Sequence, residues 1–141
     1  MVDSNIIIYA YDPTDPAKQA TAIKLIEEQI AKRTLVVSAQ VLNEFYHRAT
    51  RSNRPPSLSH EAAAAVVQKI VDAAVVLPIT AAVTLRALGG VASYGMSFWD
   101  ALIWAAASEN AETVIYTEDL PGLADVEGVR YVNPFDAESA P

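Results

Sequence analysis

Short apolar runs alternate along the chain with longer amphipathic stretches, which is the pattern of an α/β domain. The runs that read as strands are residues 34–37, 75–79, 113–117 and 129–132. Strands separated by helices of this length pair in parallel through right-handed crossovers. The pattern therefore predicts an α/β domain with a parallel sheet, whose site lies beyond the carboxyl ends of the strands.

The predicted helices begin at residues whose side chains cap helix N-termini. The expected helices run from the Asp15 cap and Pro16 to about Arg33, from the Ser38 cap toward the break at Arg54-Pro55-Pro56, from Ser59 to about Ala74, from Thr80 to Gly89-Gly90, and from Ser97 to about Asn110. In the first of these, Ala20, Ile23, Ile26 and Ile30 share one apolar face. We expect these helices to cover the sheet.

The first residues of the chain are harder to assign. Residues 5–11 contain three consecutive isoleucines and read as a strand, but two turns of buried helix would show the same pattern. Met1 and Val2 are expected to end a first strand, which would place Asp3 at its carboxyl edge. Both assignments stay open at this point.

Composition narrows the class of protein. The 141 residues fit one domain, residues 1–141, and a hydrophobic fraction of 52% argues against disorder. No apolar run approaches the roughly 20 residues needed to cross a bilayer, and no secretory signal is visible. The absence of cysteine excludes disulfides and thiol catalysis. We expect a cytoplasmic protein.

Four carboxylates stand inside apolar, aromatic-rich segments: Asp3, Glu44, Asp100 and Asp119. An ionised acid that leaves water is costly unless it is paired, hydrogen-bonded or bound to a metal. Few basic residues lie near these segments, so a divalent cation is the simplest partner. Carboxylate oxygens suit Mg²⁺ or Mn²⁺ rather than zinc.

Each acid also has an ordinary structural interpretation. Asp3 can bond its own backbone in a turn, and Glu44 can pair with Arg48 one helical turn further on. Asp100 stands in a first helical turn, where it complements the helix dipole. Asp119 follows a strand, in a loop, where acids are common, and its neighbour Glu118 competes with it. Only their common placement at element ends makes them one candidate site.

The net charge of −7 argues against general attraction to nucleic acid, although two divalent cations in one acidic site would bring it to −7 + 4 = −3. Basic residues are concentrated at His47, Arg48, Arg51 and Arg54. This run is either a solvated helix end, the more ordinary interpretation, or a patch that contacts phosphates. His47 and His60 are too isolated to indicate zinc, and both are expected at the surface.

Four segments resemble PIN-domain ribonucleases and, within that superfamily, the VapC toxins of bacterial toxin–antitoxin pairs. They are Val2-Asp3-Ser4-Asn5, Gln40-Val41-Leu42-Asn43-Glu44-Phe45, Ser97-Phe98-Trp99-Asp100-Ala101-Leu102-Ile103 and Tyr116-Thr117-Glu118-Asp119-Leu120. The resemblance runs in order from Asp3 to about Val132. It implies a three-layer α/β/α fold around a central parallel sheet.

The resemblance also implies a site and a reaction. The implied catalytic and metal-binding residues are Asp3, Glu44, Asp100 and Asp119, with Asn5, Ser97 and Thr117 in support. Asp3 and Asp100 would be the central ligands of Mg²⁺ or Mn²⁺, and metal-activated water would cleave RNA. The family further implies that the chain is a type II toxin and forms a homodimer. It also implies a cognate antitoxin, which blocks the acidic groove.

Two other functions compete with this one. A catalytically silent PIN-like module would only bind a protein partner, but the four acids are intact. Another Mg²⁺ enzyme such as a phosphatase would need an Asp-x-Asp pair, which the predicted strand ends lack.

The chain also departs from the resemblance in two ways. Only Met1 and Val2 precede Asp3, and the family implies a helical turn at residues 6–10.

Overall fold

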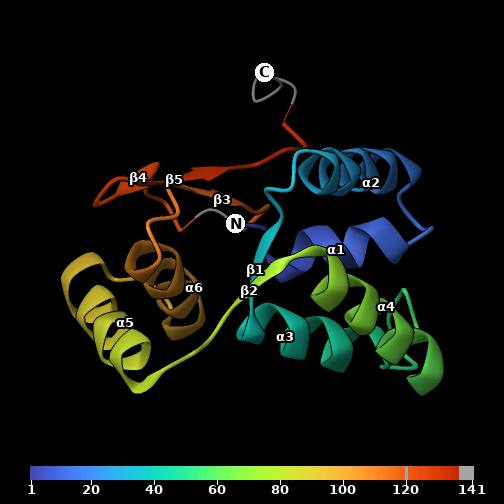
Figure 1. The fold of residues 1–141 in the computed structure, drawn as a ribbon, viewed down its shortest axis with the longest axis horizontal. Helices are drawn as coiled ribbons and strands as arrows, with labels where there is room; N and C mark the ends of the chain where they lie inside the picture. Colours follow the sequence, from blue (N-terminus) through green and yellow to red (C-terminus); the bar gives the residue numbers. More distant parts are fainter. Residues whose placement is uncertain (120, 137–141) are drawn as a thin grey trace.

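The computed structural model describes residues 1–119 and 121–136 (Figure 1). Leu120 of the fourth resembling segment lies outside this part, as do residues 137–141. The helices are α1 (Ser4–Tyr11), α2 (Pro16–Ala31), α3 (Ala39–Ala49), α4 (His60–Ala73), α5 (Ala81–Tyr94) and α6 (Phe98–Glu109). The strands are β1 (Val36–Ser38), β2 (Val75–Leu77), β3 (Val114–Tyr116), β4 (Asp125–Val126) and β5 (Val129–Val132).

The first three residues join two short sheets into one. β1 pairs in parallel with β2, and β3 pairs in parallel with β5, whose other edge carries β4 in the antiparallel direction. The Val2 N–H donates to the Val36 carbonyl at 2.8 Å, and Tyr116 exchanges backbone bonds of 2.9 and 3.0 Å with Met1 and Asp3. The predicted parallel sheet is confirmed, with β4 as an unpredicted antiparallel edge.

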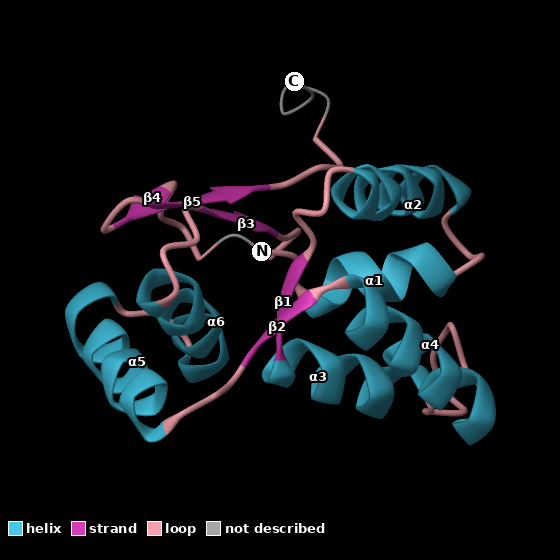
Figure 2. Ribbon diagram, in the orientation of Figure 1, coloured by secondary structure: helices cyan, strands magenta, loops and turns pink. Residues whose placement is uncertain are grey.

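Helices lie on both sides of this sheet, which confirms the three-layer α/β/α fold. Figure 1 shows α5 and α6 beneath the β3–β5–β4 part, and α1 to α4 gathered on the other side of β1 and β2. The same layers are visible by element type in Figure 2. Residues 101–107 of α6 are all buried, since α6 lies between α5 and the sheet. No helix in the described part is long and apolar enough to cross a membrane.

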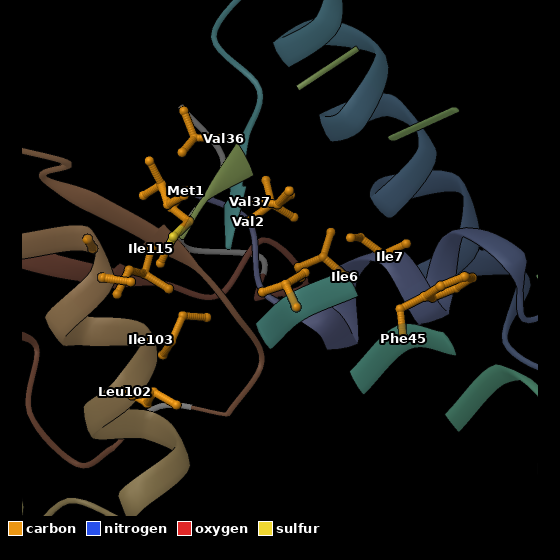
Figure 3. Packing of buried hydrophobic residues seen from close by; sticks show 14 of the residues in the cluster. Met1, Val2, Ile6, Ile7, Val36, Val37, Phe45, Leu102, Ile103 and Ile115 are labelled. Carbon is orange, nitrogen blue, oxygen red and sulfur yellow. The ribbon is translucent and has the colours of Figure 1, made fainter. Parts of the chain in front are cut away.

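The short amino-terminal segment lies in the core. Val2 is 1% exposed and packs near Val37 and Ile115 (Figure 3). Ile6 of α1 and Phe45 of α3 are fully buried in the same cluster. Burial of such a side chain contributes on the order of 1.5–3 kcal/mol, so this cluster fixes Asp3 at the sheet edge.

The helix starts agree with the caps in the sequence. Asp15, Ser38, Ser59, Thr80 and Ser97 each accept a hydrogen bond from the backbone N–H three residues further on. Residues 5–11 belong to helix α1, so their strand interpretation is wrong and the helical turn implied by the resemblance is confirmed. Helix α1 is buried on nearly every side, and a helix buried all around shows no amphipathic period.

Helix α5 does not end at Gly89-Gly90. It continues to Tyr94 and ends at Gly95, whose φ of 66° is the left-handed conformation of a helix C-terminus. A Cβ on Gly90 would stand 2.8 Å from the Trp104 ring, whereas a Cβ on Gly89 would meet nothing within 4 Å. Gly90 therefore allows α5 to pack closely on α6. In the sequence pattern the same glycine indicates a helix end.

Two other expectations about burial are wrong. The predicted buried strand at residues 75–79 is the shorter edge strand β2, and Val75 is 59% exposed. In α2 the fully buried residue is Ala22, while Ile23 and Ile30 are 39% and 42% exposed. Helix α2, which packs against α1, therefore turns Ala22 rather than the predicted isoleucine face toward the interior.

The contact between Gly90 and Trp104 gives a stability test. Both Gly89→Ala and Gly90→Ala gain about the same helix propensity, roughly 1 kcal/mol. Only the second adds a methyl group against the Trp104 ring, and such overpacking costs about 1–3 kcal/mol. We expect urea denaturation to show Gly90→Ala less stable than Gly89→Ala by that amount. Equal unfolding free energies would mean that the ring moves aside at no cost.

Candidate functional site

The four carboxylates line one cavity of about 350 Å³ at the carboxyl edge of the sheet. Asp3 follows the amino-terminal segment and Asp119 follows β3. Glu44 comes from the middle of α3, and Asp100 from the first turn of α6. Asp3 and Asp119, which are 116 positions apart, thus line one cavity, as their placement at strand ends predicts, and the two helical acids line the same cavity.

Asp3 is the acid held most firmly by the fold. Its Oδ1 accepts the Ser4 N–H at 2.6 Å, which caps α1, and its Oδ2 accepts the Thr117 hydroxyl at 2.7 Å. Burial raises the pKa of Asp3 to about 6, and the charges of Glu44 and Asp119 act in the same direction. The hydrogen bonds from Thr117 and Ser4 lower that pKa but do not outweigh burial.

Asn5 links three polar groups of the site. Its buried side-chain amide donates to Thr117 Oγ1 at 2.9 Å, to Asp119 Oδ2 at 3.2 Å and to Asp3 Oδ2 at 3.3 Å. Thr117 also accepts the Asp119 N–H at 3.1 Å, which tightens the turn after β3. The amide therefore holds the carboxylates of two chain segments at a fixed separation.

Glu44 is held by two residues that the sequence did not single out as site residues. Its carboxylate accepts the Ser4 hydroxyl at 2.8 Å and the Gln40 side-chain amide at 2.8 Å. The ion pair with Arg48, which is the ordinary interpretation of a helical acid at this spacing, does not form. The available signals were the position of Ser4 beside Asp3 and that of Gln40 one helical turn before Glu44.

Asp100 has the structural role and also the position of a ligand. The Ser97 hydroxyl donates to its Oδ2 at 2.7 Å, while its own N–H donates to Ser97 Oγ at 3.2 Å. Ser97 thereby orients the carboxylate through a hydrogen bond and begins the helix. The capping interpretation and the site interpretation are compatible because Asp100 still lines the cavity.

The structure separates Asp119 from its neighbour Glu118. Glu118 forms an ion pair with Lys18 of α2 and accepts the Tyr9 hydroxyl at 2.5 Å. Burial opposes ionisation of Glu118, but the hydrogen bonds from Lys18 and Tyr9 outweigh it and lower its pKa. Asp119 lines the acidic cavity and Glu118 does not, so Asp119 is the candidate site residue of the two.

The donor set fits a hard divalent cation. Within residues 1–119 and 121–136, none of the four acids forms an ion pair with a lysine or arginine. As the side chains of that same part of the chain are placed, no three His, Cys, Asp or Glu residues stand close enough together to hold a metal ion. Burial is the main cause of the raised pKa of Asp3, and the charges of Glu44 and Asp119 add to it. Carboxylate oxygens are the ligands that Mg²⁺ and Mn²⁺ take.

The basic run lines the same cavity as the acids. His47, Arg48, Arg51 and Arg54 all line it, and all four are exposed. The Arg51 Nη2 and His47 Nε2 atoms lie 2.6 Å apart. His60 is exposed as expected and contacts the Tyr46 hydroxyl, away from the acids. The run is thus a solvated helix end that also borders the acidic site.

Comparisons with known proteins agree with the fold. A family model described as PIN domain matches residues 1–127. Among solved structures, the chain is similar to Mycobacterium tuberculosis VapC20, which is described as a Sarcin-Ricin loop cleaving toxin. That match has a TM-score of 0.67 and 23% identity, and it covers 84% of this chain and 88% of the other. At this identity the likeness shows the fold. No curated protein matches.

The pKa of Asp3 predicts how stability depends on pH when a chelator is present. The pKa is about 6 in the folded chain against 3.8 for an ordinary Asp, so ionisation favours unfolding. Below about pH 3 the carboxyl is protonated in both states and costs the folded state nothing. As pH rises, ionisation destabilises the folded state, by about 3 kcal/mol above about pH 7. Between about pH 5 and 7.5 we expect the wild type to lose about 1 kcal/mol more than Asp3→Asn in urea denaturation.

The control for this measurement is Glu27→Gln, a substitution at an exposed acid of α2. We expect it to keep the pH profile of the wild type. Identical pH profiles for the wild type and Asp3→Asn would show that Asp3 is not the group responsible.

Proposed function

We propose that the chain, which belongs to the PIN domain family, is a divalent-cation-dependent endoribonuclease and the toxin of a VapC-type, type II toxin–antitoxin pair. The observation that carries this proposal is the convergence of four carboxylates from four segments on one cavity. The described part of the chain supplies no lysine or arginine partner for them. A cation is the partner that completes such a cluster.

The residues of the proposed site have two roles: some bind the cation, and others orient these ligands. Asp3 and Asp100 are the central ligands, and Glu44 and Asp119 complete the set directly or through water. When bound, Mg²⁺ or Mn²⁺ lowers the pKa of a water and stabilises charge on the phosphodiester. Asn5, Ser97 and Thr117 keep the carboxylates oriented through the hydrogen bonds described above.

RNA is the substrate that the surroundings of the acids support. The positive wall formed by His47, Arg48, Arg51 and Arg54 attracts phosphates to a site whose net charge would otherwise repel them. The similarity in fold to VapC20, a toxin that cleaves the Sarcin-Ricin loop, supports the same substrate class. We propose no particular RNA as the target.

The proposed partners are a cognate antitoxin and a second copy of the chain, in the cytoplasm. An apolar groove of about 320 Å³ between α2 and α4 supports protein docking. It is lined by Ile23, Ile26, Ile30 and Ile70 among other residues, and Tyr11 at its edge is 36% exposed. Exposed apolar grooves of this kind are typical of interfaces.

Adjacent acids provide a matched test of the cation site. We expect Asp3→Asn, Asp100→Asn and Asp119→Asn to lower Mg²⁺- or Mn²⁺-dependent RNA cleavage by about 100-fold or more, since each removes charge that the metal needs. Glu118→Gln, whose side chain points to Lys18, is expected to retain the wild-type rate. Rates of RNA cleavage with the metal, and with chelator added, measure this.

Cleavage that resists the chelator, or equal rates in Asp119→Asn and Glu118→Gln, would contradict the metal mechanism. No cleavage by the wild type together with retained antitoxin binding would instead identify a catalytically silent binding module.

The basic wall predicts a change in salt dependence. Arg48→Gln and Arg51→Gln each remove one cation that contacts phosphate, so RNA binding in chelator should weaken and the slope of log K against log salt should fall by about 0.7. Lys24→Gln removes an equal charge from the exposed face of α2 and should leave the slope unchanged. Fluorescence anisotropy of labelled single-stranded RNA measures these slopes. Equal slopes in all variants would show that the basic run does not contact phosphates and is only a solvated helix end.

A further inference from the structure

A second cavity of about 530 Å³ adjoins the acidic one. Four residues line both cavities: Gln40, Glu44, His47 and Trp99. The remaining lining residues are Asn43, Ile79 and Leu102. Ile79 follows the end of β2, so this cavity lies at the same edge of the sheet as the acids. It is more apolar than its neighbour and is separated from it only by shared side chains.

Trp99 is the most conspicuous wall of this second cavity. Its side chain is 61% exposed, so Trp99 does not serve as a core residue. It directly precedes Asp100 in the chain. Phe98 packs against it in an edge-on arrangement with ring centroids 5.4 Å apart. A large exposed indole beside a phosphodiester-cleaving site matches the aromatic platforms on which proteins stack unpaired bases.

Gln40 fixes the position of this platform relative to the acids. Its amide nitrogen donates to Glu44 Oε1 at 2.8 Å and to the Trp99 carbonyl at 3.2 Å, which ties α3 to the first turn of α6. Gln40 is 7% exposed, and its side-chain oxygen is buried without a donor in the described part of the chain. The two bonds of the Gln40 amide nitrogen therefore hold the Trp99 backbone at a fixed position relative to Glu44.

We propose that this second cavity is a subsite for one unpaired nucleobase of the RNA, next to the phosphate that the acidic site cleaves. The base stacks on Trp99, and the exposed amide of Asn43 bonds its edge, as Asn side chains do with bases. The proposal rests on the proposed ribonuclease function and adds a determinant of sequence preference to it. It also gives the enzyme a preference for single-stranded RNA, because a paired base presents no free ring face.

The contiguity of the two cavities favours a base over a protein side chain as occupant. Glu44 belongs to the acidic site, and His47 belongs to the basic wall. An occupant of the second cavity therefore lies next to Glu44 of the cleaving site and next to His47 of the phosphate-binding wall. A nucleotide carries a ring and a phosphate within one ligand, and RNA is the substrate class of the proposed function.

Tryptophan fluorescence tests the stacking directly. The chain has two tryptophans, and Trp104 is 2% exposed, so a ligand in solution reaches only Trp99. Single-stranded RNA oligonucleotides added in chelator should quench the fluorescence. In copies that carry one abasic ribose, the quenching should be lost at one position and kept at the others.

Variants of Trp99 separate stacking from folding. We expect Trp99→Ala to weaken binding of the intact RNA by about 5- to 150-fold, the range that stacking of one base supplies. It should bind the intact RNA and the sensitive abasic copy equally. Trp99→Phe keeps an aromatic face and should stay close to the wild type. Leu85→Ala, a truncation of a residue that is 69% exposed on α5, is the control and should not change binding.

Three results would overturn the subsite: equal RNA affinity for Trp99→Ala and the wild type, no abasic position with a distinct effect, or a change in oligomeric state of Trp99→Ala in sedimentation. The last would identify the cavity as an interface between copies. Failure of the ribonuclease proposal looks different, since RNA would then stay intact with Mg²⁺ or Mn²⁺. Position-specific quenching would in that case still support the base subsite.

Discussion

The rest of the structure depends on the burial of Val2 between two halves of a sheet. Val2 donates to β1 on one side, and its neighbours bond Tyr116 of β3 on the other, so this short segment converts two small sheets into one. Apolar burial on both faces stabilises the segment although it is too short to form a strand alone. Because Asp3 follows directly, the interaction that closes the sheet also fixes the first acid at its carboxyl edge.

The site is assembled at an electrostatic cost that neutral polar groups limit. Burial raises the pKa of Asp3 to about 6, and the charges of Glu44 and Asp119 act in the same direction. The hydrogen bonds of Asn5 and Thr117 hold the Asp3 and Asp119 carboxylates without neutralising them. A lysine in their place would remove the charge that a cation needs. Glu118, the neighbour of Asp119, shows this effect, since its charge is paired with Lys18.

Most of the fold could be predicted because its signals are local. Side-chain caps such as Ser38 and Thr80 act within three residues, and the helices begin where the caps indicate. Predictions that needed a distant partner were wrong or open. Gly90 read as a helix end because its reason is the ring of Trp104, and the isoleucine face of α2 was misplaced because α1 decides which side is covered. Residues 5–11 stayed ambiguous because burial on all sides removes periodicity.

The sequence by itself indicated which four acids form the candidate site, the donor chemistry they offer and the strand ends that carry two of them, Asp3 and Asp119. Motif order and the α/β pattern carry this information, since element ends in a parallel sheet meet at one edge. Only the tertiary structure decided that Glu118 turns to Lys18 while Asp119 faces the cavity, that Glu44 bonds Ser4 and Gln40 rather than Arg48, and that Trp99 walls a second cavity. These choices depend on groups far apart in the chain, whose distances no local pattern encodes.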